Sequence, residues 1–169
     1  SMIFFMQYLC ENYSADSRIK SLVDAREFFI IPCVNPDGWE YNRLNGGAGA
    51  GWRKNRRLIT GTTYGVDLNR NYGVEWGTCA NVTCGSASSC GSSSPSSDTY
   101  YGPSAFSESE TRAVRDLCYA HNFVAAIDQH CYGPYYSLPY GKTARTLTTL
   151  EKKFFTYVPA LMGQYNGMR

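Results

Sequence analysis

Apolar residues recur at helical spacing near both ends of the chain. Residues 3–12 carry the first such stripe, and their apolar side is predicted to be the buried face of a helix. Residues 17–22 either continue that helix or form a turn. A second stripe occupies residues 148–165, where Pro159 is expected to kink or interrupt the helix, because proline lacks the N–H that the helix uses.

A third helix and a strand are predicted between these ends. Ser107–Glu110 has the S-x-x-E pattern of a capping box, which predicts a helix running to about His121. The apolar run at residues 123–130 then predicts a strand. Because side chains alternate along a strand, Asp128 and His130 should share one face near its end.

An apolar run without alternation lies earlier, at residues 27–34, and ends in the turn signal of residues 35–38. Such a run is typical of a strand buried on both faces. With helices and strands alternating, the pattern predicts an α/β fold with a mixed, largely parallel central sheet flanked by helices. The length of 169 residues favours one domain, residues 1–169, which is large enough to bury a core.

The chain has seven cysteines, an odd number that leaves at least one unpaired within it. Three lie in apolar stretches and are expected to be buried thiols: Cys33, Cys118 and Cys131. Three more lie in a Ser- and Gly-rich stretch, where a local disulfide is expected: Cys79, Cys84 and Cys90. That stretch, residues 77–104, and residues 42–64 are predicted to be long loops, which are often functional.

Charge and hydropathy narrow the classes of partner and compartment. The chain has 16 Lys and Arg against 14 Asp and Glu, and a net charge of +2 gives no reason to expect nucleic acid or a membrane surface as a partner. No apolar run approaches the roughly 18 residues that a membrane span needs. Two N-glycosylation sequons, at Asn12 and Asn81, favour a secreted or lumenal location of the vacuolar or lysosomal kind.

Arginine and asparagine gather in two loop segments, residues 51–57 with Arg53 and residues 65–72 with Asn69 and Arg70. A guanidinium group matches the two oxygens of a carboxylate or phosphate, so these loops are candidates for binding such an anion. A solvated basic loop is the alternative. The residues alone leave His130 open as a metal ligand, a general base or a hydrogen-bonded polar residue.

Taken in order, several segments resemble the successive signatures of the zinc carboxypeptidase family, of the pancreatic carboxypeptidase A type. They are Val34-Asn35-Pro36-Asp37-Gly38, Trp52-Arg53-Lys54-Asn55-Arg56, Gly65-Val66-Asp67-Leu68-Asn69-Arg70-Asn71, Ser94-Pro95-Ser96-Ser97-Asp98-Thr99-Tyr100, Ser107-Glu108-Ser109-Glu110-Thr111, His130-Cys131-Tyr132 and Pro139-Tyr140-Gly141. The resemblance covers roughly residues 7–163 and implies a three-layer α/β sandwich.

The resemblance also implies an activity: hydrolysis of the C-terminal peptide bond of peptides and proteins. Arg53 would polarise the scissile carbonyl and stabilise the developing oxyanion. Asn69 and Arg70 would grip the free carboxylate at the C-terminus of the substrate, which an internal peptide bond does not offer. Tyr132 would line the substrate groove.

Zinc is the cofactor that the resemblance implies for the complete enzyme. His130 is similar to the third zinc ligand of the family, and Asp67 to the acid that orients another ligand histidine from behind. The family takes its first two ligands from a His-x-x-Glu motif, which does not occur in this sequence, whose only other histidine is His121. A catalytic zinc needs three protein ligands, so we expect this chain alone neither to hold zinc stably nor to hydrolyse peptides.

Two further expectations follow from the missing pieces of the family pattern. The chain is interpreted as a partial domain with an open sheet edge, which should favour self-association. The alternative function is a non-catalytic relative that binds peptide C-termini. A serine hydrolase is disfavoured because no Gly-x-Ser-x-Gly segment is present.

Overall fold

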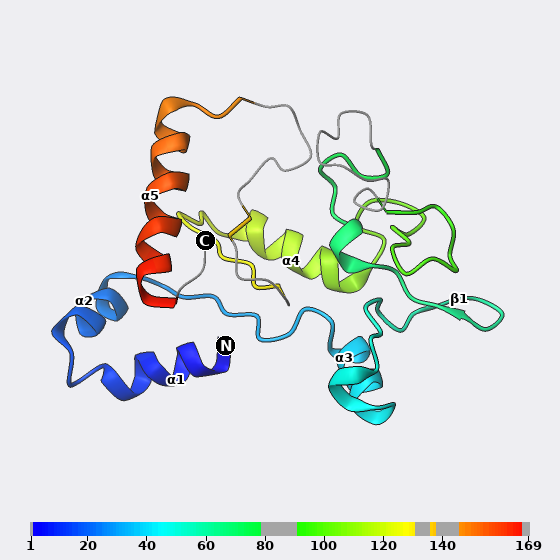
Figure 1. Cartoon of the computed structure of the whole chain (residues 1–169), viewed down its shortest axis with the longest axis horizontal. Coiled ribbons are helices and arrows are strands. Elements are labelled where there is room, and N and C mark those ends of the chain that lie inside the picture. Colours follow the sequence, from blue (N-terminus) through cyan, green and yellow to red (C-terminus); the bar gives the residue numbers. More distant parts are fainter. Residues whose placement is uncertain (1, 79–90, 131–135, 138–145, 167–169) are drawn as a thin grey trace. The chain divides into compact units, whose positions relative to one another are not determined.

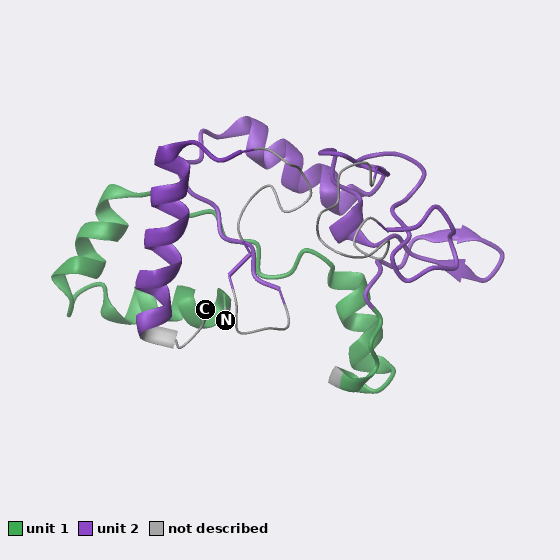
Figure 2. Ribbon diagram, turned by 45° about the horizontal axis from the view of Figure 1, so that its top comes forward, with its two compact units in different colours: residues 1–52 green, residues 53–169 purple. Residues whose placement is uncertain are grey.

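The computed structural model describes residues 2–78, 91–130, 136–137 and 146–166 (Figure 1). Its chain divides into two compact units, residues 1–52 and residues 53–169 (Figure 2). The helices and strands are, in order, α1 (Met2–Asn12), α2 (Ser17–Ala25), α3 (Pro36–Leu44), η1 (Gly47–Gly49), β1 (Leu58–Thr60), β2 (Thr63–Tyr64), η2 (Leu68–Arg70), α4 (Ser109–Ala120) and α5 (Thr149–Asn166). The expectation of one domain stays a prediction.

The first unit begins with the helix predicted from residues 3–12, which is confirmed as α1. Residues 17–22 belong to a separate helix, α2, because Asp16 caps a new start: its side chain accepts a hydrogen bond from the Arg18 amide at 2.8 Å. The expected burial of the apolar side of α1 is wrong. Of its residues only Leu9 is buried, and Ile3 and Phe4 are 71% and 69% exposed.

The turn signal at residues 35–38 begins a helix instead. The side chain of Asn35 accepts a hydrogen bond from the Gly38 amide at 3.0 Å, and Pro36 occupies the first turn of α3. An Asx cap followed by proline is as favourable at a helix start as in a turn, so the same residues serve either structure.

The predicted buried strands are not formed. Residues 27–34 and 123–130 have no strand assignment, and Val124 and Ile127 are 87% and 70% exposed. A strand forms its backbone hydrogen bonds only with a neighbour, and neither segment finds one in the part of the chain that the structure describes. The sheet that is present there is a two-stranded antiparallel pair, β1 with β2. Helices and strands both occur, as the α/β class requires, but the mixed, largely parallel central sheet is not formed among the described residues.

The two later helices are confirmed, with changes of detail. The helix predicted after Ser107 is α4, and it ends at His121 as expected, but its N-cap is Glu108 and no side chain caps it there. The capping box does not form: the Ser107 hydroxyl donates to the Glu108 carboxylate at 2.6 Å and accepts from Nδ2 of Asn71 at 2.9 Å. Helix α5 runs through Pro159 without interruption, and much of its apolar stripe is exposed: Leu150, Phe154, Tyr157 and Leu161.

The cysteines expected to be buried can be compared with the structure where it describes them. Cys33 and Cys118 are exposed, so the expectation of buried thiols is wrong for them, because the strand around the first did not form and the second faces outward on α4. Cys131 and the three cysteines of the loop lie outside the described residues.

Among the residues searched, no helix is long and apolar enough to cross a membrane. Self-association stays a prediction.

The interior of the second unit is largely polar. Three of its described hydrophobic side chains are buried, Val66, Leu68 and Tyr100. Around them lie buried polar or charged residues: Lys54, Asn55, Asp67, Asn71, Glu108 and Thr111. Burying such groups is favourable only when each is hydrogen-bonded, so the packing of this unit depends on a network of polar contacts.

Candidate functional site

Arg53 and Asp67 form the first pair of the candidate site. One carboxylate oxygen of Asp67, Oδ2, accepts hydrogen bonds from Nη2 and Nε of Arg53 at 2.8 and 3.1 Å. Asp67 is 2% exposed, whereas the side chain of Arg53 is 44% exposed. The guanidinium group is therefore anchored on a buried carboxylate, while nearly half of the Arg53 side chain is exposed to solvent.

The second pair, Asn69 and Arg70, belongs to the short helix η2. Asp67 begins this helix, since its Oδ1 accepts a hydrogen bond from the Asn69 amide at 3.1 Å. Asn69 is exposed, and Arg70 donates from Nη1 to the Asn69 carbonyl oxygen at 3.1 Å. The Asp67 carboxylate thus binds Arg53 and also caps the start of η2, which contains Asn69 and Arg70.

Arg70 contains an unusual buried donor. Its Nε is buried and has no hydrogen-bond partner among the described residues. An unmet buried donor costs about 1–3 kcal/mol, and more when charged, so such a group in a polar site indicates a place for an acceptor. Gly91 lies against the stem of this side chain: a Cβ there would stand 3.2 Å from Arg70 Cγ and 2.8 Å from the Thr99 carbonyl oxygen.

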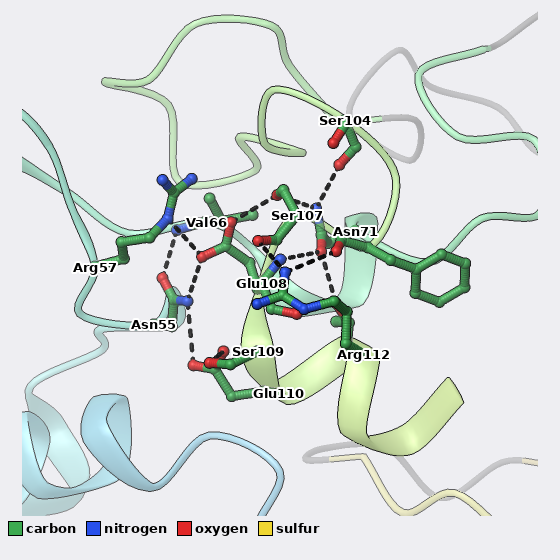
Figure 3. A network of polar contacts seen from close by, with 12 residues as sticks. Asn55, Arg57, Val66, Asn71, Ser104, Ser107, Glu108, Ser109, Glu110 and Arg112 are labelled. Carbon is green, nitrogen blue, oxygen red and sulfur yellow. Dashed lines mark hydrogen bonds and ion pairs between the residues drawn. The ribbon is translucent and has the colours of Figure 1, made fainter. Parts of the chain in front are cut away.

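Asn55 joins the two loops that carry these residues (Figure 3). Its amide donates to the Val66 carbonyl oxygen at 2.9 Å, and its Oδ1 accepts from the Val66 amide at 2.8 Å. Its Nδ2 donates to Oε2 of Glu108 at 2.8 Å. Arg57 donates from Nε to that same oxygen, also at 2.8 Å. One buried carboxylate therefore fixes Asn55 and, through it, the residue that precedes Asp67.

Asn71 makes a second hub directly after Arg70, and it is fully buried. Its Nδ2 donates to the carbonyl oxygens of Tyr101 and Ser104 at 2.9 and 3.1 Å and to the Ser107 hydroxyl at 2.9 Å. Its Oδ1 accepts from the Thr111 hydroxyl at 2.7 Å and from the Glu108 amide at 3.2 Å. These contacts tie η2 to the start of α4.

The electrostatics of this network centre on buried ionic groups. Burial favours the neutral form of Glu108, but hydrogen bonds from Ser107, Arg57 and Asn55 outweigh it and hold the pKa of this carboxyl below its usual value. Burial lowers the pKa of the Lys54 ammonium, and its Nζ donates to the Pro95 carbonyl oxygen at 2.9 Å. Glu108 is thus ionised at neutral pH and balances Arg57.

His130 stands in a more open environment. Its Nε2 lies 3.2 Å from Oδ2 of Asp128, and its side chain is 59% exposed. The pKa of Tyr72 is raised by burial and also by the negative charge of Asp128, so the 128–130 segment lies within electrostatic reach of the residue two positions after Arg70. Tyr132 lies outside the described residues.

A catalytic zinc ion requires three protein ligands. No group of three His, Cys, Asp or Glu side chains that could hold a metal occurs among the residues that the structure describes. His130 and its neighbour Asp128 supply at most part of a site, so the described residues by themselves do not fit a catalytic zinc.

The sequence and fold of the chain are similar to those of known proteins. A sequence model described as zinc carboxypeptidase matches residues 1–162. The chain belongs to the zinc carboxypeptidase family. This confirms the resemblance that the signature segments indicated, and it makes the chain part of an enzyme family.

Individual relatives agree with this assignment. Carboxypeptidase O of Bos taurus is 32% identical over 147 residues, covering 83% of this chain and 35% of that protein. Carboxypeptidase A1 of Bos taurus is 31% identical and covers 96% of this chain and 37% of its own length. The solved structure of thrombin activatable fibrinolysis inhibitor matches with a TM-score of 0.76 and 27% identity, covering 99% of this chain and 40% of that one.

The comparisons also show how much of its relatives this chain represents. The chain spans about a third of the length of the curated relatives it matches. The likeness to the solved structure extends over 99% of the chain, although the predicted strands lack partners in the described part. The structure brings Arg53, Asp67, Asn69 and Arg70 together, and sequence reasoning missed the buried residues that hold them, Asn55, Asn71 and Glu108, although all three lie inside the signature segments.

Proposed function

We propose that the protein acts as a zinc carboxypeptidase, which cleaves the C-terminal peptide bond of peptides and proteins. This chain would contribute the residues that bind the free carboxylate of the substrate. The observation that carries the proposal is the buried Nε of Arg70, which has no hydrogen-bond partner among the described residues, in the residue that directly follows the exposed Asn69. A carboxylate is the acceptor that best matches a guanidinium edge, because both oxygens accept in parallel.

Arg53 would act on the reacting carbonyl group. Its guanidinium is oriented by the Asp67 carboxylate, yet 44% of its side chain remains exposed to solvent and therefore to a substrate. A preorganised donor of this kind stabilises negative charge as it develops on the carbonyl oxygen, and removing one typically costs about 10²–10³ in rate. Family membership and the Asp67 contact support this role.

Bound zinc would supply Lewis acidity and an activated water in the complete enzyme. Within this chain, His130 is the residue proposed to ligate it, with its other ring nitrogen oriented by a neighbour such as Asp128. The natural partner would be a peptide or protein C-terminus. The sequons at Asn12 and Asn81 support a secreted or lumenal location.

We expect the purified chain to hold well under one zinc ion per molecule after dialysis against trace zinc. The reason is that its described residues present no set of three ligands. Elemental analysis by mass spectrometry measures this directly, and the His130→Ala variant is the matched control for any zinc that is found. About one zinc per chain in the wild type and none in the variant would contradict the expectation.

The carboxylate-binding role is tested with two ligands that differ in one group. These are acetyl-glycyl-phenylalanine and its C-terminal amide, titrated into the chain while the amide and arginine Nε–H signals are followed by NMR. We expect the free acid to bind about 10-fold or more tightly than the amide, as a charge-assisted hydrogen bond predicts. Equal dissociation constants for the two ligands would overturn the proposed function.

A further inference from the structure

Glu108 is buried at the start of α4 and contacts both of the loops that form the candidate site (Figure 3). Its side chain is 1% exposed to solvent. It lies far from the site in sequence, 37 to 53 residues after the asparagines of the loops that it contacts.

The first connection runs from Glu108 to Arg53 through Asn55. Oε2 of Glu108 accepts from Nδ2 of Asn55 at 2.8 Å, which leaves Oδ1 of Asn55 turned toward the Val66 amide, 2.8 Å away. With the Asn55 amide also bonded to Val66, the loop before Asp67 is locked beside the loop that follows Arg53. The Glu108 contact thus sets the orientation of the Asn55 side chain on which this pairing depends.

The second connection runs from Glu108 to Arg70 through Asn71. The Glu108 amide donates to Oδ1 of Asn71 at 3.2 Å, and Oε1 of Glu108 accepts from the Ser107 hydroxyl, which in turn accepts from Nδ2 of Asn71. Both ends of the Asn71 side chain are therefore bonded to Glu108 or to its neighbour. Since Asn71 directly follows Arg70, its placement fixes the end of η2.

We propose that Glu108 is a positioning residue that sets the placement of Arg53 relative to Arg70. It would contact no substrate, and it would act through Asn55 on one loop and through Asn71 on the other. The spacing between a carbonyl-polarising and a carboxylate-binding arginine must match the last residue of a peptide, so a shift of the loops would weaken recognition of the carboxylate. The inference rests on the function proposed above and adds the residue that makes it geometrically possible.

A purely structural role for Glu108 predicts something different. The ion pair with Arg57 has one half-exposed partner, whose side chain is 44% exposed, and such pairs contribute little by themselves. Losing a merely structural contact would lower the folded fraction and so weaken the binding of every ligand alike. Losing a positioning contact would weaken the binding of the free acid more than that of the amide.

The test compares Glu108→Ala, Glu108→Gln and the wild type for the ratio of the two dissociation constants, acetyl-glycyl-phenylalaninamide over acetyl-glycyl-phenylalanine. We expect the alanine variant to lower this ratio about 10-fold, the scale seen when a supporting hydrogen bond behind a functional residue is removed. The glutamine variant should restore most of it. Its oxygen can accept from Asn55 and Arg57, and its amide can donate to the Ser107 hydroxyl.

Glu110→Ala is the matched control. Glu110 also accepts from Nδ2 of Asn55, at 3.1 Å, but it lies nearer the surface, and among the described residues it makes no hydrogen bond or ion pair with Arg57 or Ser107. The same truncation two residues away should leave the ratio unchanged. A Glu108→Ala variant that keeps the wild-type ratio would overturn the proposal, and so would a Glu110→Ala variant that loses as much as Glu108→Ala.

If the alanine variant does not fold, the same ratio of dissociation constants is measured with Glu108→Asp. It keeps a buried carboxylate to balance Arg57 but withdraws it from Asn55 by one methylene group, so the ratio should still fall several-fold. An unchanged ratio in folded Glu108→Asp would overturn the inference. A wild-type chain that binds acid and amide equally would overturn the proposed function itself, and the two failures are therefore distinguishable.

Discussion

Replacing Gly102 with alanine should open the polar network of the second unit. Gly102 has φ +87°, and a Cβ there would stand 2.5 Å from the Ser107 hydroxyl oxygen and 2.7 Å from Nδ2 of Asn71. The variant must both adopt a strained backbone and push apart two hydrogen-bonded groups. We expect the free energy of local opening to fall by about 2–4 kcal/mol, from roughly 1 kcal/mol of strain and 1–3 kcal/mol of lost hydrogen bonding.

Amide hydrogen exchange measures this opening locally. The amides to follow are those of Asp67, bonded to the Tyr100 carbonyl oxygen at 2.8 Å, and Phe106, bonded to the Asn71 carbonyl oxygen at 2.7 Å. Gly61→Ala is the control: Gly61 has φ +52° in the β1–β2 turn, and nothing lies within 4 Å of its Cβ position. That variant carries the backbone strain without the clash, so both amides should keep their protection. Equal loss of protection in the two variants would show that the clash is irrelevant.

The helices were predictable because their signals are local. A stripe of apolar residues at helical spacing, as in α1 and α5, follows from the geometry of a single element. Backbone hydrogen bonds within a helix need no second segment, so residues 2–12 and 149–166 are helical even where their apolar sides are exposed. What the pattern could not supply was the partner that would cover those sides.

The strands were not predictable in the same way. Residues 27–34 and 123–130 have the composition of buried strands, but a strand exists only when a neighbour accepts its hydrogen bonds. The pair that does form, Leu58–Thr60 with Thr63–Tyr64, is joined by a tight turn at Gly61, so its partner is close in sequence. Local closure explains why this hairpin forms while the more apolar segments remain irregular.

The functional residues fall into two groups by how they could be found. Arg53, Asn69 and Arg70 could be named from the order of the signature segments. Asn55, Asn71 and Glu108 could not, because an asparagine beside a loop arginine or a glutamate before a helix is common in any sequence. Their importance comes from burial and from contacts that span 37 to 53 residues of chain, which a local pattern does not contain.

Replacing Arg70 with lysine should remove most of the preference for a free carboxylate. Lysine keeps the positive charge but loses the planar fork, and with it the buried Nε that has no partner among the described residues. We expect the ratio of the amide dissociation constant to that of the acid, measured with acetyl-glycyl-phenylalanine and its amide, to fall about 10-fold. Binding of the amide should change little, because it offers no second anionic oxygen to the fork.

Arg56→Lys is the control: it makes the same substitution outside the carboxylate-binding pair of Asn69 and Arg70. The Arg56 guanidinium stacks over the Tyr64 ring at 4.5 Å from its centroid, so it belongs to the neighbouring loop and hairpin. It should keep the wild-type ratio. Since the wild type and both variants carry the same net charge, long-range attraction of the acid is equal in all three. A ratio that falls only in Arg70→Lys must then come from the geometry of the Arg70 guanidinium group. No fall in either variant would assign carboxylate recognition to the charge of the loops as a whole, and an equal fall in both would deny Arg70 a special role.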